Sequence, residues 1–189
     1  MASRSTRTSP SRRQTERGAG AAPLLTIRLT RKHDGAVVFD LRRRDGTSTW
    51  QKRTGPTARF FAVHDLTHYA VETELGFRRA FYGLVAEGWD LTDFGHPWPR
   101  GPLPDEALPA EVIVGCFDRA RAAHEALSAQ ACNTAASLYF ANAGRASPVA
   151  VTDAELARVQ TRLSELVWQW RALPEGETME LRFGEQSGG

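Results

Sequence analysis

Residues 24–53, LLTIRLTRKHDGAVVFDLRRRDGTSTWQKR, decide the fold because apolar and polar residues alternate along three short runs. The runs cover residues 24–30, 36–41 and 47–53. Alternation over such lengths is typical of strands that bury one face. An Asp-Gly pair ending at Gly35 and another ending at Gly46 mark tight turns between the runs. The stretch therefore predicts an antiparallel three-stranded meander.

The rest of the chain is mostly helical in pattern. Helices are expected over residues 60–90 with an interruption at Gly76, over 109–129, over 131–143 and from Thr152 to about Trp170. Thr152 followed by Glu155 is a capping-box signature for the start of the last of these helices. Residues 180–183 can form a last short strand that returns to the meander. The predicted fold class is α+β, with the sheet packed against four to five helices.

Length and composition fit one folded domain with flanking tails. The chain has 189 residues, of which 41% are hydrophobic and 24% charged. These values exclude a wholly disordered chain, a collagen and a disulfide-dense mini-protein. No apolar run of transmembrane length occurs, so we expect no membrane partner. We expect a disordered basic tail over residues 1–22, a globular domain over 23–184 and a disordered tail over 185–189.

The net charge of +2 has two unequal parts. Residues 1–22 hold five Arg and one acidic residue, a net charge of +4, which leaves −2 on the rest of the chain. The tail has no apolar segment of the kind that a secretory signal contains. Its Arg residues and the run Arg42, Arg43 and Arg44 are the only features that favour nucleic acid. Since the body is acidic, we do not expect a nucleic-acid partner.

Two cysteines, Cys116 and Cys132, stand in apolar helical sequence with no CxxC pair. The spacing offers neither a zinc ribbon nor a redox motif. We expect small buried core residues with free thiols, which are typical of a reducing compartment. The predicted location is cytoplasmic.

Chemistry is concentrated in residues 60–76, FFAVHDLTHYAVETELG. His64, His68 and Glu72 are spaced by four, which places them in a line on one face of a helix. Two histidines at this spacing can bind one divalent metal ion, as they do in zinc sites, and zinc is the predicted cofactor. Asp65 is the predicted catalytic residue, acting as a general base or as a further ligand. The helix is apolar on most of its surface, so we expect it to be buried.

A third ligand has to come from elsewhere, and the sequence offers several carboxylates and histidines. Glu87 is the first choice and Glu72 the second, followed by a group in the next loop and helix: Asp90, Asp93, His96 and His124. Each has a structural alternative. The histidine pair can be purely structural, Glu87 can form an ion pair with Arg78 or Arg79, and Glu72 can be an exposed helix charge.

The string from His64 to Glu72, together with Gly76, Phe77 and residues 83–89, resembles a group of small bacterial proteins with no assigned function, over residues 24–104. His64 and His68 are also similar to the HExxH pair of zincin peptidases, with Asp65 in place of the Glu. His64, Asp65 and His68 are similar to the HDxxH motif of a ubiquinone-biosynthesis family, whose downstream Glu falls at Ala80 here. That resemblance implies a zinc-type site acting on a lipid-like quinone precursor.

A His-Asp doublet also occurs in the HD phosphohydrolases, which are all-helical. The strands predicted at the start of this chain argue against that family. The sequence therefore favours a metal-binding protein and, within that class, a metal-dependent hydrolase of a small molecule or peptide. The alternative is a non-enzymatic domain that binds a small ligand or a protein and has structural histidines.

Overall fold

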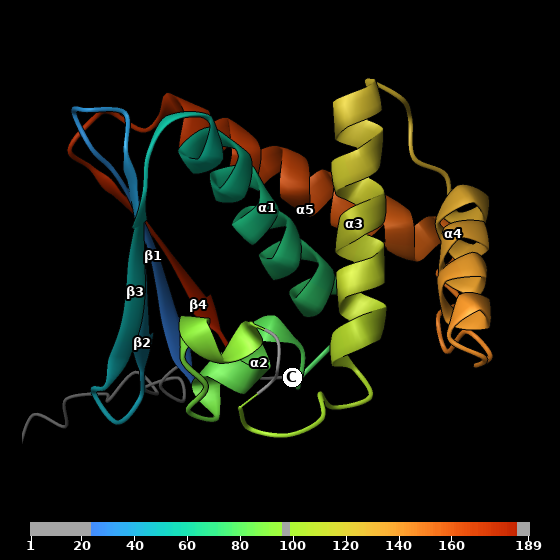
Figure 1. The fold of residues 1–189 in the computed structure, drawn as a ribbon. Coiled ribbons are helices and arrows are strands. Elements are labelled where there is room, and N and C mark those ends of the chain that lie inside the picture. Colours follow the sequence, from blue (N-terminus) through green and yellow to red (C-terminus); the bar gives the residue numbers. More distant parts are fainter. Residues whose placement is uncertain (1–23, 96–98, 185–189) are drawn as a thin grey trace, which may run out of the picture.

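The computed structural model describes residues 24–95 and 99–184. The predicted tails, residues 1–22 and 185–189, lie outside these ranges, as does His96. The described residues form an α+β fold in which helices cover one face of a four-stranded antiparallel sheet (Figure 1). The strand order is β3-β2-β1-β4, which confirms both the meander and the returning C-terminal strand.

The elements follow the predicted order with shifted ends. The strands are β1 Leu25–Arg31, β2 Val37–Arg43, β3 Ser48–Arg53 and β4 Thr178–Phe183. The helices are α1 Gly55–Glu74, α2 Phe81–Ala86, α3 Ala107–Ala123, α4 Ala129–Asn142 and α5 Asp153–Ala172, with a 3-10 helix η1 at Leu91–Phe94. The capping box of α5 is present as predicted, with Thr152 and Glu155 bonded to each other's backbone amides.

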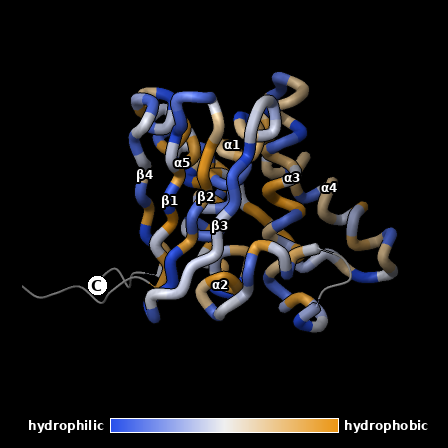
Figure 2. Tube along the Cα trace, turned by 60° about the vertical axis from the view of Figure 1, so that its left-hand side comes forward, coloured by the Kyte–Doolittle hydropathy of each residue, from blue (hydrophilic) through white to orange (hydrophobic). Residues whose placement is uncertain are grey.

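The sheet buries one face because its alternating residues come into register. Leu29 of β1 pairs with Phe39 of β2, and Ile27 of β1 pairs with Leu181 of β4. All four of these side chains are buried beneath the helices. The opposite face is polar at Arg28, which pairs with Glu180 across the strands. In Figure 2 the edge strand β3 is drawn largely in the blue and white of polar residues.

Helix α1 begins earlier than the sequence predicted. Pro56 lies in its first turn, where a proline is well tolerated because no backbone donor is lost. The whole HDxxH segment is therefore inside the helix. The helix ends at Glu74, and Gly76 follows it with a φ of 74°, a left-handed conformation that glycine adopts easily. The predicted helical stretch 60–90 is thus two helices, α1 and the short α2.

The helices form successive layers away from the sheet (Figure 1). Helices α1 and α2 contact the sheet, α5 and α3 both pack against α1, and α4 packs on the far side of α3. No described helix combines the length and apolar character needed to cross a membrane. This layering buries α1 from Asp65 to Glu72, where every residue is shielded from solvent.

Candidate functional site

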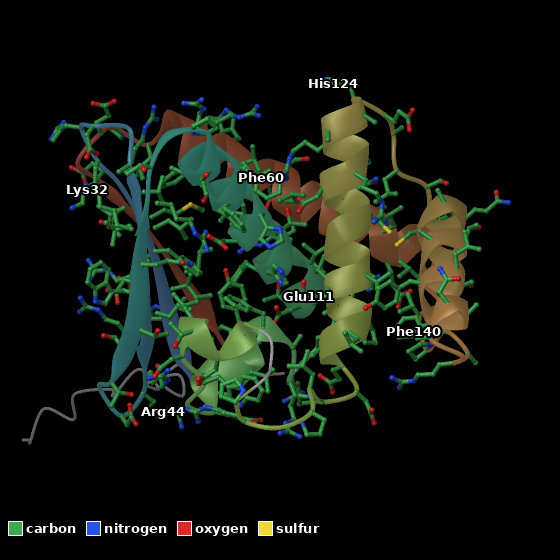
Figure 3. The ribbon with its side chains drawn as sticks, viewed as in Figure 1. Lys32, Arg44, Phe60, Glu111, His124 and Phe140 are labelled. Atoms are coloured by element: carbon green, nitrogen blue, oxygen red, sulfur yellow. The ribbon has the colours of Figure 1, made fainter. Side chains whose placement is uncertain are left out.

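His64 and His68 lie one turn apart on the side of α1 that meets α3. Their ring centroids are 4.8 Å apart, so the two imidazoles are in contact. The side chain of His68 is only 3% exposed, whereas that of His64 is 22% exposed. Figure 3 labels Phe60 and Glu111 in the region between the two helices, and the ring of Phe60 stacks on His64. The pair is therefore a buried histidine beside a partly open one.

Asp118 of α3 holds the outer histidine. Its Oδ2 is 2.7 Å from Nδ1 of His64, and its Oδ1 is 2.8 Å from Arg121 on the same helix. Within the described residues, Nε2 of His64 has no hydrogen-bond partner. A carboxylate on Nδ1 fixes the orientation of an imidazole ring and favours the tautomer whose Nε2 is a free acceptor.

Two carboxyl groups face the inner histidine. Nδ1 of His68 is 3.3 Å from Oε1 of Glu72, and its Nε2 is 3.5 Å from Oε1 of Glu111 on α3. Burial lowers the pKa of His68, so the neutral ring is favoured. A neutral ring has one proton for its two nitrogens. The nitrogen without a proton therefore needs a protonated carboxyl group or a cation between it and its carboxyl neighbour.

Glu72 is a buried carboxyl with a structural task. Its Oε2 accepts a 3.0 Å hydrogen bond from the amide of Tyr82, and it also interacts with the amides of Phe81 and Gly83. These are the first amides of α2, which have no partners within that helix. Burial raises the pKa of Glu72 well above its ordinary value in spite of these bonds. Glu72 therefore joins α1 to α2, and the alternative of an exposed helix charge is wrong.

Asp65 points to a different neighbour from the histidines. Its Oδ2 forms a 2.5 Å ion pair with Nη1 of Arg53 at the end of β3. The guanidinium of Arg53 also lies over the ring of Phe61, 4.2 Å from its centroid. Burial raises the pKa of Asp65 to about 6, although the charge of Arg53 opposes the change. The structure thus provides Asp65 with a partner on the sheet side of α1.

The remaining candidates are engaged elsewhere. Glu87 is 43% exposed and forms a two-point contact with Arg79, with distances of 2.8 and 2.9 Å, as its structural alternative predicted. Asp90 pairs with Arg43, and Asp93 pairs with Arg100. His124 is exposed at the C-terminal end of α3, and Figure 3 shows it far along the helix from Glu111.

The sequence predictions missed Glu111, Asp118 and Arg53. Glu111 and Asp118 are seven positions apart, a spacing that returns to the same face of a helix after two turns. That spacing was a usable signal in the sequence. Nothing in the sequence, however, indicates that this face of α3 packs on His64 and His68, because the contact is tertiary.

The described residues contain no group of three or more His, Cys, Asp or Glu side chains already arranged to hold a metal ion. The two histidines are adjacent, but their carboxyl neighbours either bond to Nδ1 or reach Nε2 from one side. The arrangement of ligands for a complete metal site would require the side chain of Glu111, which is 47% exposed, to rotate.

The chain was compared with protein-family models, with curated proteins and with solved structures, and no match was found in any of the three.

Proposed function

We propose that this protein binds a divalent metal ion, zinc by preference, between α1 and α3. Nε2 of His64 and Nε2 of His68 are the two nitrogen ligands, and the carboxylate of Glu111 is the third ligand in place of Glu87. The observation that carries the proposal is that Nδ1 of each histidine faces a carboxyl group, Asp118 for His64 and Glu72 for His68.

Metal-binding histidines nearly always donate the N–H of their other ring nitrogen to a carboxylate or a carbonyl. This bond fixes the ring and leaves Nε2 as the electron-pair donor. Two neighbouring histidines on one helix with the same carboxyl partnership therefore support a shared cation. The lowered pKa of His68 supports it too, because only a neutral imidazole can bind a metal.

The contact between Nε2 of His68 and Oε1 of Glu111 supports the choice of third ligand. When Nδ1 carries the proton, these two atoms are both acceptors facing each other at 3.5 Å. A cation between them turns this unfavourable contact into two bonds. Glu111 is half-exposed, and its only contact with the site is His68, so a rotation toward a metal ion costs little.

The chemistry that such a site supplies is hydrolysis. Three protein ligands leave an open position on zinc, and a water bound there loses a proton near neutral pH. The partly exposed His64 and the half-exposed Glu111 put that position on the accessible side of the site. We propose a small-molecule or peptide substrate. For Asp65, the base predicted from the sequence, the raised pKa is the one supporting observation, because its Oδ2 faces Arg53 on the sheet side of α1.

Metal analysis of the purified full chain tests the binding proposal. The chain is stripped with chelator, reloaded with zinc and freed of excess metal. We expect one zinc per chain and a higher melting temperature for the loaded form. Absence of stoichiometric zinc, with melting unchanged by chelator, would contradict the proposal. Turnover of ester, phosphoester and peptide substrates by the loaded form then tests hydrolysis.

The second candidate is a non-enzymatic domain with structural histidines. It is supported by the same contacts, with the protons placed on different atoms. If Glu72, whose pKa is raised, carries a proton, it can donate to Nδ1 of His68, and Nε2 can then donate to Glu111. This arrangement needs no metal. It predicts that replacing His64 and His68 with Ala lowers stability while zinc has no effect on either form.

Free thiols support a reducing compartment. Cys116 and Cys132 are both unpaired and buried. We retain the cytoplasm as the proposed location on that ground.

A further inference from the structure

A second group of reactive side chains lies on the other side of α3 from the histidines. Cys116 of α3 and Cys132 of α4 are both buried, with exposed fractions of 3% and 0%. Figure 3 shows sulfur atoms in the space between these two helices. Glu111 and Asp118 contact histidines of α1, whereas Cys116 contacts a residue of α4. The thiol pair is therefore separate from the proposed metal site.

Cys116 contacts Cys132 across the interface of α3 and α4. Sγ of Cys116 is 4.0 Å from the carbonyl oxygen of Cys132, and an interaction between the two thiols contributes to both of their pKa values. Arg119, one turn further along α3, donates a hydrogen bond from Nη2 to Sγ of Cys116 at 3.3 Å. Arg119 is exposed, so its cationic side chain reaches Cys116 from the solvent side of α3.

These contacts affect the two thiols in opposite directions. The interaction with the thiol of Cys132, helped by the positive charge of Arg119, lowers the pKa of Cys116 to about 7. The same interaction, together with burial, raises the pKa of Cys132. A thiolate beside a thiol that keeps its proton is the arrangement of an attacking and a resolving cysteine.

We propose that Cys116 and Cys132 form a reversible disulfide that links α3 to α4 when the protein meets a peroxide. The thiolate of Cys116 attacks one oxygen of hydrogen peroxide and becomes a sulfenic acid. The O–O bond breaks, and the other oxygen leaves as water after taking a proton. The sulfur of Cys132 then displaces the hydroxyl group of the sulfenic acid. Its thiol proton leaves with that hydroxyl as a second water.

The electrons balance, since peroxide is reduced to water as the two thiols are oxidised to one disulfide. A dithiol reductant reverses the step by exchange. The chain closed by this bond includes all residues between the two cysteines, among them the connection from α3 to α4. Oxidation therefore fixes α4 to α3 covalently.

The test uses the full chain, reduced and then freed of reductant and metal. It is exposed to hydrogen peroxide while folded, and free thiols are counted after unfolding in denaturant. We expect both thiols to be lost, the intact mass to fall by two hydrogen atoms, and a proteolytic map to join the Cys116 and Cys132 peptides. Two thiols still free after an exposure that oxidises a small-molecule thiol would overturn the proposal, as would disulfides only between chains.

Single substitutions test the assigned order of events. In Cys132→Ser, Cys116 should gain one oxygen and react with a dione that traps sulfenic acids. In Cys116→Ser, Cys132 should stay reduced under the same exposure. Equal reactivity of the two variants would contradict the asymmetry. If a serine variant does not fold, the matching alanine variant replaces it, and the wild-type mass measurement is decisive without either.

Discussion

Three carboxyl groups surround the two histidines, and each is held in a different way. Glu72 is buried and bonded to the amides of α2, and Asp118 is shared between His64 and Arg121. Glu111 is half-exposed and approaches only His68. Of the three, Glu111 alone is available to bind an ion without breaking another contact, which is why it replaces Glu87 in the proposed site.

Glu111→Gln should weaken zinc binding by roughly 10–100-fold or more, because a neutral amide is a far poorer ligand than a carboxylate. Glu87→Gln is the matched control, since Glu87 has the same carboxyl group but contacts Arg79. Its zinc affinity should equal that of the wild type. Competition with a chromophoric chelator measures both. A loss of affinity in Glu87→Gln with none in Glu111→Gln would restore the ligand predicted from sequence.

Asp118→Asn should lower zinc affinity by about 10–100-fold, because the amide no longer fixes the tautomer of His64. The same chelator competition applies. Urea unfolding serves as the control. A variant that loses zinc affinity through a general loss of structure would also have a lower free energy of unfolding. Unchanged affinity in a folded variant would mean that His64 does not bind the ion through Nε2.

The raised pKa of Asp65 predicts that the free energy of unfolding decreases as pH rises. Its pKa is raised by burial from 3.8 to about 6 in the folded chain, so the protonated form favours folding. Its contribution to stability is complete below about pH 4 and is lost as pH rises through about 6. The free energy of unfolding of the wild type, relative to Asp65→Asn, should fall by up to ~3 kcal/mol over that range.

Urea unfolding of both proteins between pH 4 and pH 7, in chelator, measures this difference. Subtracting the variant removes the effect of the other carboxyl groups. A difference that grows with pH would show that the ion pair with Arg53 outweighs burial and holds the carboxyl of Asp65 ionised.

At the scale of elements, the short helix α2 depends on side chains from its neighbours. Glu72 of α1 accepts from its first amides, and Arg43 of β2 donates to the carbonyl oxygens of Val85 and Trp89 at its other end. A helix of this length is not stable alone. The side chains of Glu72 and Arg43 fix its position, and Tyr82 in turn donates to the carbonyl oxygen of Asp65 on α1.

Gly83 allows α2 to pack in this position. A Cβ atom at Gly83 would lie only 1.8 Å from the carbonyl oxygen of Arg78, so Gly83→Ala should destabilise the fold by ~2 kcal/mol or more. Gly115 of α3 is the matched control. A Cβ there meets only the side chain of Arg119 at 3.7 Å, and Gly115→Ala should stabilise by up to ~1 kcal/mol through helix propensity.

Urea unfolding measures the free energy of unfolding of the two alanine variants, which should change in opposite directions. Equal stability of the two variants would mean that α2 does not approach Arg78 as closely as described. The ring current of Tyr82 on nearby proton resonances would report independently on whether α2 keeps its place.

The elements could be predicted because their signals are local. Alternation marks β1 and β2, the pair Thr152 and Glu155 marks the start of α5, and the four-residue spacing of His64 and His68 fits a helix. The third ligand could not be predicted in this way, because it depends on a tertiary contact. Glu87 could face the histidines only as part of a longer helix packed on α1, but α2 ends at Ala86 and Glu87 pairs with Arg79.

At the scale of the whole molecule, the site results from the order of the layers. The sheet supplies Arg53 to one side of α1, and α3 supplies Glu111 and Asp118 to another side. The polar side chains of α1 therefore lie where the sheet on one side and α3 on another can supply their partners. Among the described residues, the buried polar side chains Asp65, Thr67, His68 and Glu72 all belong to α1. Such a concentration on one helix costs stability unless each group is paired.

Calorimetric titration of zinc into the chelator-stripped full chain, beside the variant His64→Ala/His68→Ala, tests the central claim most directly. The account predicts one zinc per wild-type chain and no specific binding to the variant. Stability of the wild type should rise by about 2.7 kcal/mol at free zinc of about 100 times its dissociation constant. Identical titrations for the two proteins would contradict the account and leave His64 and His68 with a structural role.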